Sequence, residues 1–238
     1  MAQPFSIDTF NMIFYLTCFI LVVKLIIIIF ISVKIAHRGS EYALARSFMI
    51  SMLILIISLL ISRLFYMVFD FMYTKFDTDL YPTYAIWWKL GQLIVGLGLA
   101  YIVFVVDRKI LQFKLKGIFA YIIVAGSVLT LLWPVSTQSD FEFISTIGIL
   151  PNLGMLVLFF VFLNIARKTS GRLRTTAVII ILSFIFYAVA ALAVNAGLIK
   201  AFSSAVGFDV TVYMYVFQTI LKTIGIVLMA AGASRWGT

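Results

Sequence analysis

The sequence predicts an all-α, polytopic membrane protein that forms a single seven-transmembrane-helix bundle over residues 1–238. Of these residues, 64% are hydrophobic and 11% are charged, and the mean hydropathy is +1.16. Soluble domains are about 45–50% apolar and about 25% charged. The apolar residues also gather in long runs with short connections between them, which leave no room for a soluble catalytic domain. Composition and spacing together exclude most soluble enzyme folds, and we expect no enzymatic activity.

Seven segments are long enough to span a membrane, since a hydrocarbon core of about 30 Å requires roughly 20 apolar residues per helix. They are predicted at residues 11–35, 47–72, 84–106, 116–135, 143–166, 175–198 and 209–234. The first is expected to be a retained helix, because residues 1–8 lack the basic segment of a signal peptide and the following apolar run is too long for one. In the fifth, Pro151 and Asn152 predict a kink that frees a backbone carbonyl.

The basic residues predict the orientation of the bundle. Twelve of them fall at one set of segment ends, and only Lys75 and Lys200 fall at the other, where most acidic residues lie. Because basic residues are enriched on the cytoplasmic side, the N-terminus is predicted outside and the C-terminus in the cytoplasm, in a multi-pass protein of the plasma membrane. The same residues predict contact with anionic lipids of the bilayer. The twelve are Lys34, Arg38, Arg46, Arg108, Lys109, Lys114, Lys116, Arg167, Lys168, Arg172, Arg174 and Arg235.

Two residue types are too rare to support several kinds of chemistry. Cys18 is the one cysteine and His37 is the one histidine. The chain therefore cannot form an internal disulfide or a multi-histidine metal site, and a catalytic Cys–His pair is not expected. The net charge of +9 is explained by the membrane orientation. We therefore expect neither a bound metal nor a nucleic-acid partner.

Four basic residues remain inside the predicted helices, namely Lys24, Arg63, Lys89 and Lys222. A charged group at the bilayer centre costs at least about 2.5 kcal/mol, so each is a candidate for function. Lys89 lies near the end of its segment, where its stem can reach the headgroups, so it is either an interfacial anchor or a ligand contact. Arg63 shares a helical face with Tyr66 and Asp70, which suggests a structural role or a ligand contact.

Lys24 and Lys222 each lie about a dozen residues from both ends of their segments, too deep to reach the headgroups. If the helices close a ring in sequence order, the first and the last are neighbours, and the two amines share one region near the midplane. Two like charges in a low dielectric cannot both persist without an anion. We therefore expect a neutral lysine or a bound anionic group in this region.

The last segment carries a polar stripe formed by Thr211, Tyr215, Gln218, Lys222 and Gly225, which recur on one helical face. Such a stripe faces protein or a wet cavity rather than lipid. It either lines a ligand site or joins helices through hydrogen bonds. The third and sixth segments offer facing groups, so the predicted ligand-binding residues are Lys222, Gln218, Tyr215, Lys24, Gln92, Lys89, Tyr187 and Arg63.

The topology and the lysine of the last segment resemble the microbial rhodopsins. In that family this lysine carries retinal as a Schiff base, which implies attachment at Lys222 in Phe217-Gln218-Thr219-Ile220-Leu221-Lys222-Thr223-Ile224-Gly225. The family's Asp four residues earlier is Gln218 here. Its Arg-x-x-Asp-Trp corresponds to Lys89-Leu90-Gly91-Gln92-Leu93, which keeps only the basic residue and the spacing. Its Trp-x-x-Tyr-Pro corresponds to Phe184-Ile185-Phe186-Tyr187-Ala188, which keeps only the tyrosine. With both counterions replaced by glutamine, the resemblance implies a neutral Schiff base and excludes a proton pump of the usual kind.

Four functions fit these patterns. The favoured hypothesis is a receptor or sensor module that binds a small ligand, anionic or carbonyl-bearing, around Lys222 and signals through the basic cytoplasmic loops to a separate protein. A retinal-binding photoreceptor is the second. The third is an anion transporter or channel that uses the four intramembrane cations, although the cytoplasmic halves of the helices are apolar. The fourth is a structural subunit of a larger membrane complex.

Overall fold

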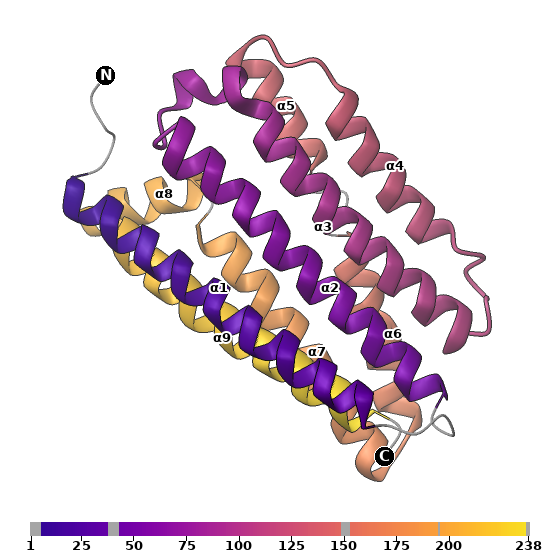
Figure 1. Ribbon diagram of the computed structural model, residues 1–238. Helices are drawn as coiled ribbons and strands as arrows, with labels where there is room; N and C mark the ends of the chain where they lie inside the picture. The colour runs from indigo at the N-terminus through magenta and orange to yellow at the C-terminus, as the bar shows by residue number, and fades with distance from the viewer. Residues whose placement is uncertain (1–5, 38–42, 149–152, 195, 237–238) are drawn as a thin grey trace.

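The computed structural model describes residues 6–37, 43–148, 153–194 and 196–236, and every regular element among them is a helix (Figure 1). The predicted all-α class is therefore confirmed. The elements are α1 (Ile7–Ala36), α2 (Ala43–Met67), a π-helix (Val68–Tyr73), a 3₁₀-helix (Thr78–Leu80), α3 (Tyr81–Lys109), α4 (Ile118–Leu132), α5 (Gln138–Ile147), α6 (Leu153–Lys168), α7 (Gly171–Ala193), α8 (Ala196–Val206) and α9 (Thr211–Arg235).

Five helical segments among the described residues are long and apolar enough to span a membrane. They correspond to the first, second, third, sixth and seventh predicted spans. α4 is also apolar but has only 15 residues. These lengths and compositions are those of a multi-pass membrane protein. The five are Ile7–Ala36, Ala43–Tyr73, Thr78–Lys109, Gly171–Ala193 and Thr211–Arg235.

The structure differs from the sequence prediction in the fifth span, residues 143–166, which is not one continuous helix. α5 ends at Ile147, and the backbone N–H of Gly148 closes its last turn. α6 then begins at Leu153. The expected kink at residues 151–152 lies outside the described residues. A short helix therefore occupies one end of the region that hydropathy alone assigned to a single span.

A second difference concerns the sixth span, which was predicted at residues 175–198. α7 begins earlier, at Gly171, and ends at Ala193. The following segment forms α8, a short helix at the end of the bundle that contacts α7 and α9 (Figure 1). Hydropathy alone could not separate these two helices, because α8 is itself largely apolar.

The long helices close a ring. α1 packs against α2 and α9, α2 packs against α3, α3 packs against α4 and α6, and α7 packs between α6 and α9. The first and last long helices are therefore neighbours, as the ring model predicted (Figure 1). This closure brings Lys24 on α1 and Lys222 on α9 to adjacent helices.

Two glycines allow α9 to approach α7 closely. A Cβ atom at Gly232 would lie 2.5 Å from Ile180 Cγ1, and one at Gly225 would lie 3.1 Å from both Ser183 O and Tyr187 N. Real Cβ atoms rarely or never approach that closely. The α7–α9 contact therefore depends on the absence of side chains at these two positions.

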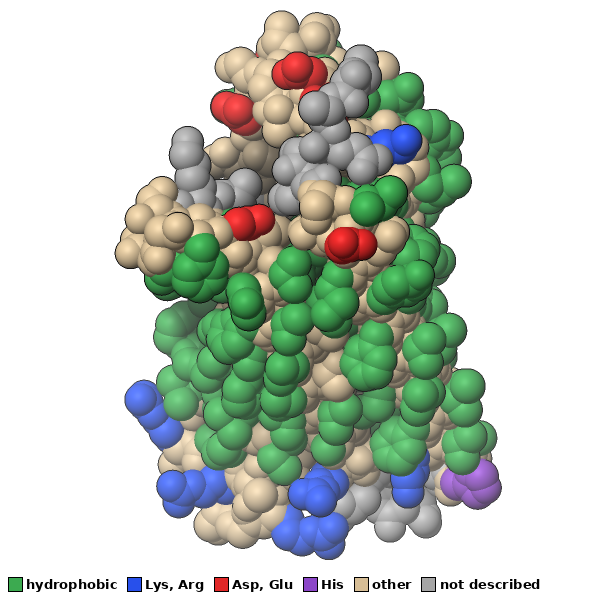
Figure 2. Space-filling model, turned by 90° about the vertical axis from the view of Figure 1, so that its left-hand side faces the viewer, with side chains coloured by type: hydrophobic (Ala, Val, Ile, Leu, Met, Phe, Trp, Pro, Cys, Tyr) green, Lys and Arg blue, Asp and Glu red, His purple; other side chains and the backbone are tan. Residues whose placement is uncertain are grey.

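The opposite ends of the bundle carry opposite charge, with a belt of hydrophobic side chains between them (Figure 2). We call the end that holds Lys34, Arg108, Lys109, Arg167 and Arg235 the basic end. The end that holds Asp77, Asp79, Asp140, Glu142 and Asp209 is the acidic end. The half of the bundle next to each end takes the same name.

The basic half is tightly packed. Phe48, Phe162 and Trp236 form an aromatic cluster with ring centroids 5.2–5.6 Å apart. Phe48 is 1% exposed and Phe162 is fully buried. Fully burying one large apolar side chain contributes about 1.5–3 kcal/mol. Most of the large core cluster, including Met52 and Leu55, belongs to this packing.

Candidate functional site

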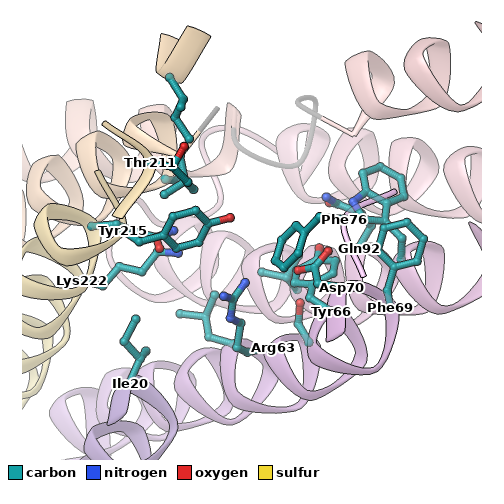
Figure 3. Close-up of a pocket in the computed structure, with 18 of the residues that line it drawn as sticks. Ile20, Arg63, Tyr66, Phe69, Asp70, Phe76, Gln92, Thr211, Tyr215 and Lys222 are labelled. Carbon is teal, nitrogen blue, oxygen red and sulfur yellow. The ribbon is translucent and has the colours of Figure 1, made fainter. Parts of the chain in front are cut away.

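A cavity of about 750 Å³ occupies the acidic half. Helices α1, α2, α3, α7 and α9 supply most of its wall, and α5, α6 and α8 contribute smaller parts. Figure 3 shows Lys222, Tyr215 and Thr211 on one side, Asp70, Tyr66, Phe69 and Gln92 on the other, and Arg63 between them. The cavity therefore joins side chains that are far apart in the sequence.

Three cations, Lys24, Arg63 and Lys222, line the cavity. Lys24 Nζ donates a hydrogen bond to Leu59 O at 2.6 Å, and Arg63 Nη2 donates to Thr17 Oγ1 at 2.9 Å. Electrostatic interactions link Arg63 to Lys24, and link Lys222 to both of them. We call these three residues the cationic wall. Lys24 and Lys222, which the sequence placed near the midplane, thus line one cavity.

The cationic wall is incompletely satisfied. Arg63 Nε is buried and has no hydrogen-bond partner among the described residues. Lys222 Nζ lies 5.9 Å from the centroid of the Tyr187 ring, and no acceptor for it is found among the residues that the structure describes. Lys24 differs from both, because a backbone carbonyl already accepts its hydrogen bond. Two donors of the wall therefore remain available to a ligand.

Two carboxylates line the same cavity but leave the cationic wall unpaired. Asp70 interacts electrostatically with Arg63 without forming a direct ion pair. Asp209 accepts hydrogen bonds from Thr211, at 2.9 Å from its backbone N and 2.5 Å from its Oγ1. Asp209 thus holds the start of α9. Three cations and two carboxylates leave the lining with a formal excess of positive charge.

The residues of the polar stripe on α9 have two different roles, because some line the cavity and one joins two helices. Thr211, Tyr215, Gln218 and Lys222 all line the cavity, whereas Gly225 lies against the backbone of α7. Thr211 and Gln218 are buried from outside solvent, at 4% and 2% exposure. The stripe therefore faces the cavity over its first three turns and joins two helices at its end.

The remaining predicted residues do not all lie at the cavity. Gln92 on α3 and Tyr187 on α7 line it. Lys89 does not belong to the lining, because its Nζ donates a hydrogen bond at 2.5 Å to Trp133 O, just past the end of α4. Lys89 thus ties α3 to the connection that leads to α5. The structure separates Lys89 from the other seven predicted residues.

An aromatic wall lies within the cavity lining and was not predicted. Phe69, Tyr81, Trp88 and Phe141 line the cavity, and Phe141 on α5 contacts the other three with ring centroids 5.1–5.8 Å apart. These residues come from the π-helix, α3 and α5. Aromatic residues recur throughout the chain, so the sequence contained no signal that these four would meet.

A local widening of the helix positions Asp70. Residues Val68–Tyr73 form a π-helix, and Thr74 closes it by donating both its backbone N–H and its hydroxyl to Phe69 O, each at 2.9 Å. Single π-turns are frequent at functional sites. The spacing from Arg63 to Asp70 was visible in the sequence, but the π-turn was not.

Gly91 makes room for Tyr66, which was not among the predicted ligand-binding residues. Tyr66 lines the cavity, and a Cβ at Gly91 would lie 2.7 Å from Tyr66 Cε1. The ring of Tyr66 therefore occupies the space that a side chain at position 91 would need. The small residue on α3 thus allows this ring to lie between α2 and α3.

The side chains of the cavity lining determine which kinds of ligand the site could hold. No group of three or more His, Cys, Asp or Glu side chains suited to a metal ion occurs among the described residues. The lining instead combines cations, amides, phenols and an aromatic wall. Comparisons with protein-family models, with curated proteins and with solved structures found no match to this chain.

Proposed function

We propose that this chain is a membrane receptor that binds a small amphipathic organic anion in the cavity of its acidic half. The observation that carries the proposal is the incompletely satisfied cationic wall, in which neither Arg63 Nε nor Lys222 has a hydrogen-bond acceptor within the described part of the chain. Leaving a buried donor unsatisfied costs about 1–3 kcal/mol. A carboxylate on the ligand would accept from both groups and balance the excess positive charge.

The aromatic wall supports a ligand that also has a flat, apolar part. Aromatic rings favour contact with flat apolar groups through stacked or edge-on arrangements. The cavity volume of about 750 Å³ falls within the range of about 300–1,000 Å³ that is typical of small-molecule sites. The ligand we propose therefore has a carboxylate at one end and a rigid conjugated body.

The proposal includes seven membrane crossings, by α1, α2, α3, α4, α6, α7 and α9. α4 and α6 have 15 and 16 residues, or about 22–24 Å at about 1.5 Å per residue. They would require local thinning of the bilayer or help from flanking residues. The charged ends support an orientation with the basic end in the cytoplasm of a plasma-membrane protein.

Signalling would pass along α9, because this helix extends from the cavity to the basic end. It carries Lys222 in the cationic wall and ends beside Trp236 in the buried aromatic cluster. If α9 can adopt two positions relative to α7, a ligand that binds the protein more tightly in one of them would shift the population toward that position. A cytoplasmic protein that recognises the basic end would then sense the change.

Three compounds with the same conjugated body test the anionic requirement. Retinoic acid, retinal and retinol carry a carboxylate, an aldehyde and an alcohol on that body. We expect retinoic acid to raise the thermal unfolding midpoint of the micelle-solubilised protein most and retinol least. Lys222→Met should remove most of the stabilisation, whereas Lys222→Arg should retain it because the positive charge remains.

Lys89→Met is the matched control, because Lys89 donates to Trp133 outside the cavity lining. This variant should respond to retinoic acid as the unchanged protein does. Equal stabilisation by the acid and the alcohol, unaffected by Lys222→Met, would contradict a receptor for organic anions.

A retinal-binding photoreceptor is the second candidate, and the unpaired amine of Lys222 favours it. Gln92 and Gln218 stand in the lining where rhodopsins have carboxylates, while Asp70 and Asp209 offer carboxylates elsewhere on the wall. If retinal attaches covalently, reductive trapping and mass measurement should find the adduct on the peptide that contains Lys222. Lys222→Arg should lose the adduct while keeping the response to retinoic acid. No adduct on the unchanged chain would exclude this candidate.

A further inference from the structure

A second cavity, of about 250 Å³, lies near the basic end between α2 and α3. Ile50, Phe104 and Val105 supply apolar walls, and Arg108 and Lys109 from the last turn of α3 lie at its charged end. We call this cavity the basic groove. It is separate from the ligand cavity, and its chemistry does not depend on the proposed receptor function.

The two cations of the basic groove have no partner among the residues that the structure describes. Among the described residues of the basic end, Asp107 is the one carboxylate, and it is 1% exposed. Its oxygens accept from the backbone N–H groups of Leu115 at 2.9 Å and Gly117 at 2.7 Å. Asp107 is thus fully engaged within the α3–α4 connection. Arg108 and Lys109 are exposed and unpaired within the described chain.

The α3–α4 connection also fixes Phe104, which is one of the apolar walls of the groove. Phe113, held at φ 62°, packs edge-on against Phe104 with ring centroids 6.2 Å apart. Gly117, at φ 70°, also comes close to Phe104. The carboxylate of Asp107 fixes the turn that contains both contacts. The groove is therefore a supported structure rather than a chance gap between exposed side chains.

We propose that the basic groove binds one anionic phospholipid. Its lining joins Arg108 and Lys109 of the last turn of α3 to apolar side chains one turn earlier on the same helix, an arrangement that suits a headgroup and its acyl chains. The phosphate would contact Arg108 and Lys109, and the hydroxyls of Ser47 and Tyr101 supply further donors in the lining. The first methylenes of an acyl chain would lie against the apolar walls. A free phosphate ion would leave those walls unused, so the charge and the apolar lining together favour a lipid.

Native mass spectrometry of the full chain in micelles tests the proposal with dioleoyl phosphatidylglycerol as the probe. We expect one tightly retained lipid on the unchanged protein and none when phosphatidylcholine replaces it. Because each cation near the surface contributes about fivefold in binding, the double substitution Arg108→Gln with Lys109→Gln should weaken retention about 30-fold. Far-ultraviolet circular dichroism and the unfolding midpoint report whether this variant is folded.

The matched control is Arg167→Gln with Lys168→Gln, which removes an adjacent exposed pair from the last turn of α6 outside the groove. This variant should retain phosphatidylglycerol as the unchanged chain does. Equal weakening in both double variants would mean that general attraction to the basic end, and not the groove, retains the lipid, which would also overturn the proposal. Unchanged retention in the Arg108 and Lys109 variant would overturn the proposal, as would equally strong competition by glycerophosphoglycerol, which has the headgroup without acyl chains.

Discussion

The acidic and basic halves of the bundle are built from the same long helices but use them differently. In the acidic half, α9 turns Tyr215, Gln218 and Lys222 toward a cavity of about 750 Å³. In the basic half, the same helix buries Met229 and Ala233 completely. The comparison indicates that packing of the basic half holds the helices together, which allows the other half to remain open.

The two halves also differ in whether their buried polar groups have hydrogen-bond partners. Asp107 in the basic half is buried, and both of its oxygens accept backbone hydrogen bonds. In the acidic half, Arg63 Nε has no hydrogen-bond partner in the part of the chain that the structure describes. Buried polar groups of proteins are nearly always satisfied. Gln138 Oε1 and Thr223 Oγ1 are unsatisfied as well, but of these three residues Arg63 is the one that lines the cavity.

The largest predicted effect comes from truncating the packed half. Phe162 is fully buried between Phe48 and Trp236, and Phe162→Ala should cost about 3–5 kcal/mol of unfolding free energy. Phe141→Ala should cost less than half as much, because its ring already borders open space. Unfolding of the micelle-solubilised protein by sodium dodecyl sulfate measures both. Equal losses would mean that the two halves are packed alike.

Gly225→Ala should have the next largest effect, because it acts where the two halves meet. Its Cβ would lie 3.1 Å from backbone atoms of Ser183 and Tyr187, which cannot rotate away. Overpacking of this kind costs about 1–3 kcal/mol. Val227→Ala, on a 46% exposed face of the same helix, should stay within about 0.5 kcal/mol. If the two variants unfold alike, the close α7–α9 contact does not contribute to stability.

Gly91→Ala should alter the cavity more than the stability of the bundle. The new methyl group would lie 2.7 Å from Tyr66 Cε1 and displace the ring that lines the cavity. We expect the affinity for retinoic acid to fall about tenfold, a change of about 1.4 kcal/mol. Gly98→Ala is the matched control, since its Cβ would meet Ser58 at 2.6 Å between the same two helices, away from the cavity lining. Ligand titrations of tryptophan fluorescence would contradict the prediction if both variants lost affinity equally.

The smallest predicted effect is a pH dependence at the acidic end. Hydrogen bonds from the backbone N–H of Ser136, and from Thr137, hold the pKa of Asp140 below its usual range. Because the pKa is lower in the folded chain, this stabilisation is present above the unfolded value of about 3.9. It is lost as the pH falls through the folded pKa.

Hydrogen exchange of the α5 amides measures this effect. Protection of the first turn, relative to that of α9, should decrease as the solution is acidified below about pH 4. In Asp140→Asn the same ratio should be low and independent of pH. A ratio in the unchanged chain that does not vary with pH would show that the hydrogen bonds to Asp140 do not stabilise the first turn of α5.

Much of the candidate site was predictable because it lies on one helix. The stripe Thr211, Tyr215, Gln218 and Lys222 follows from helical periodicity, and each of these residues lines the cavity. Ring closure then brought Lys24 to the same wall. The aromatic wall could not be predicted, since its residues come from separate elements, including α5, whose separation from α6 is not visible in hydropathy.

The sequence by itself determined that the chain is helical and belongs in a membrane, because hydrophobicity and helical periodicity are local properties that add along the chain. Only the tertiary structure decided which cations share the cavity. Lys24, Lys89 and Lys222 look alike as basic residues in apolar helices, yet the first donates to Leu59, the second to Trp133, and the third faces the cavity without a described acceptor. A hydrogen-bond partner depends on distances between helices, and those distances depend on packing of the whole bundle.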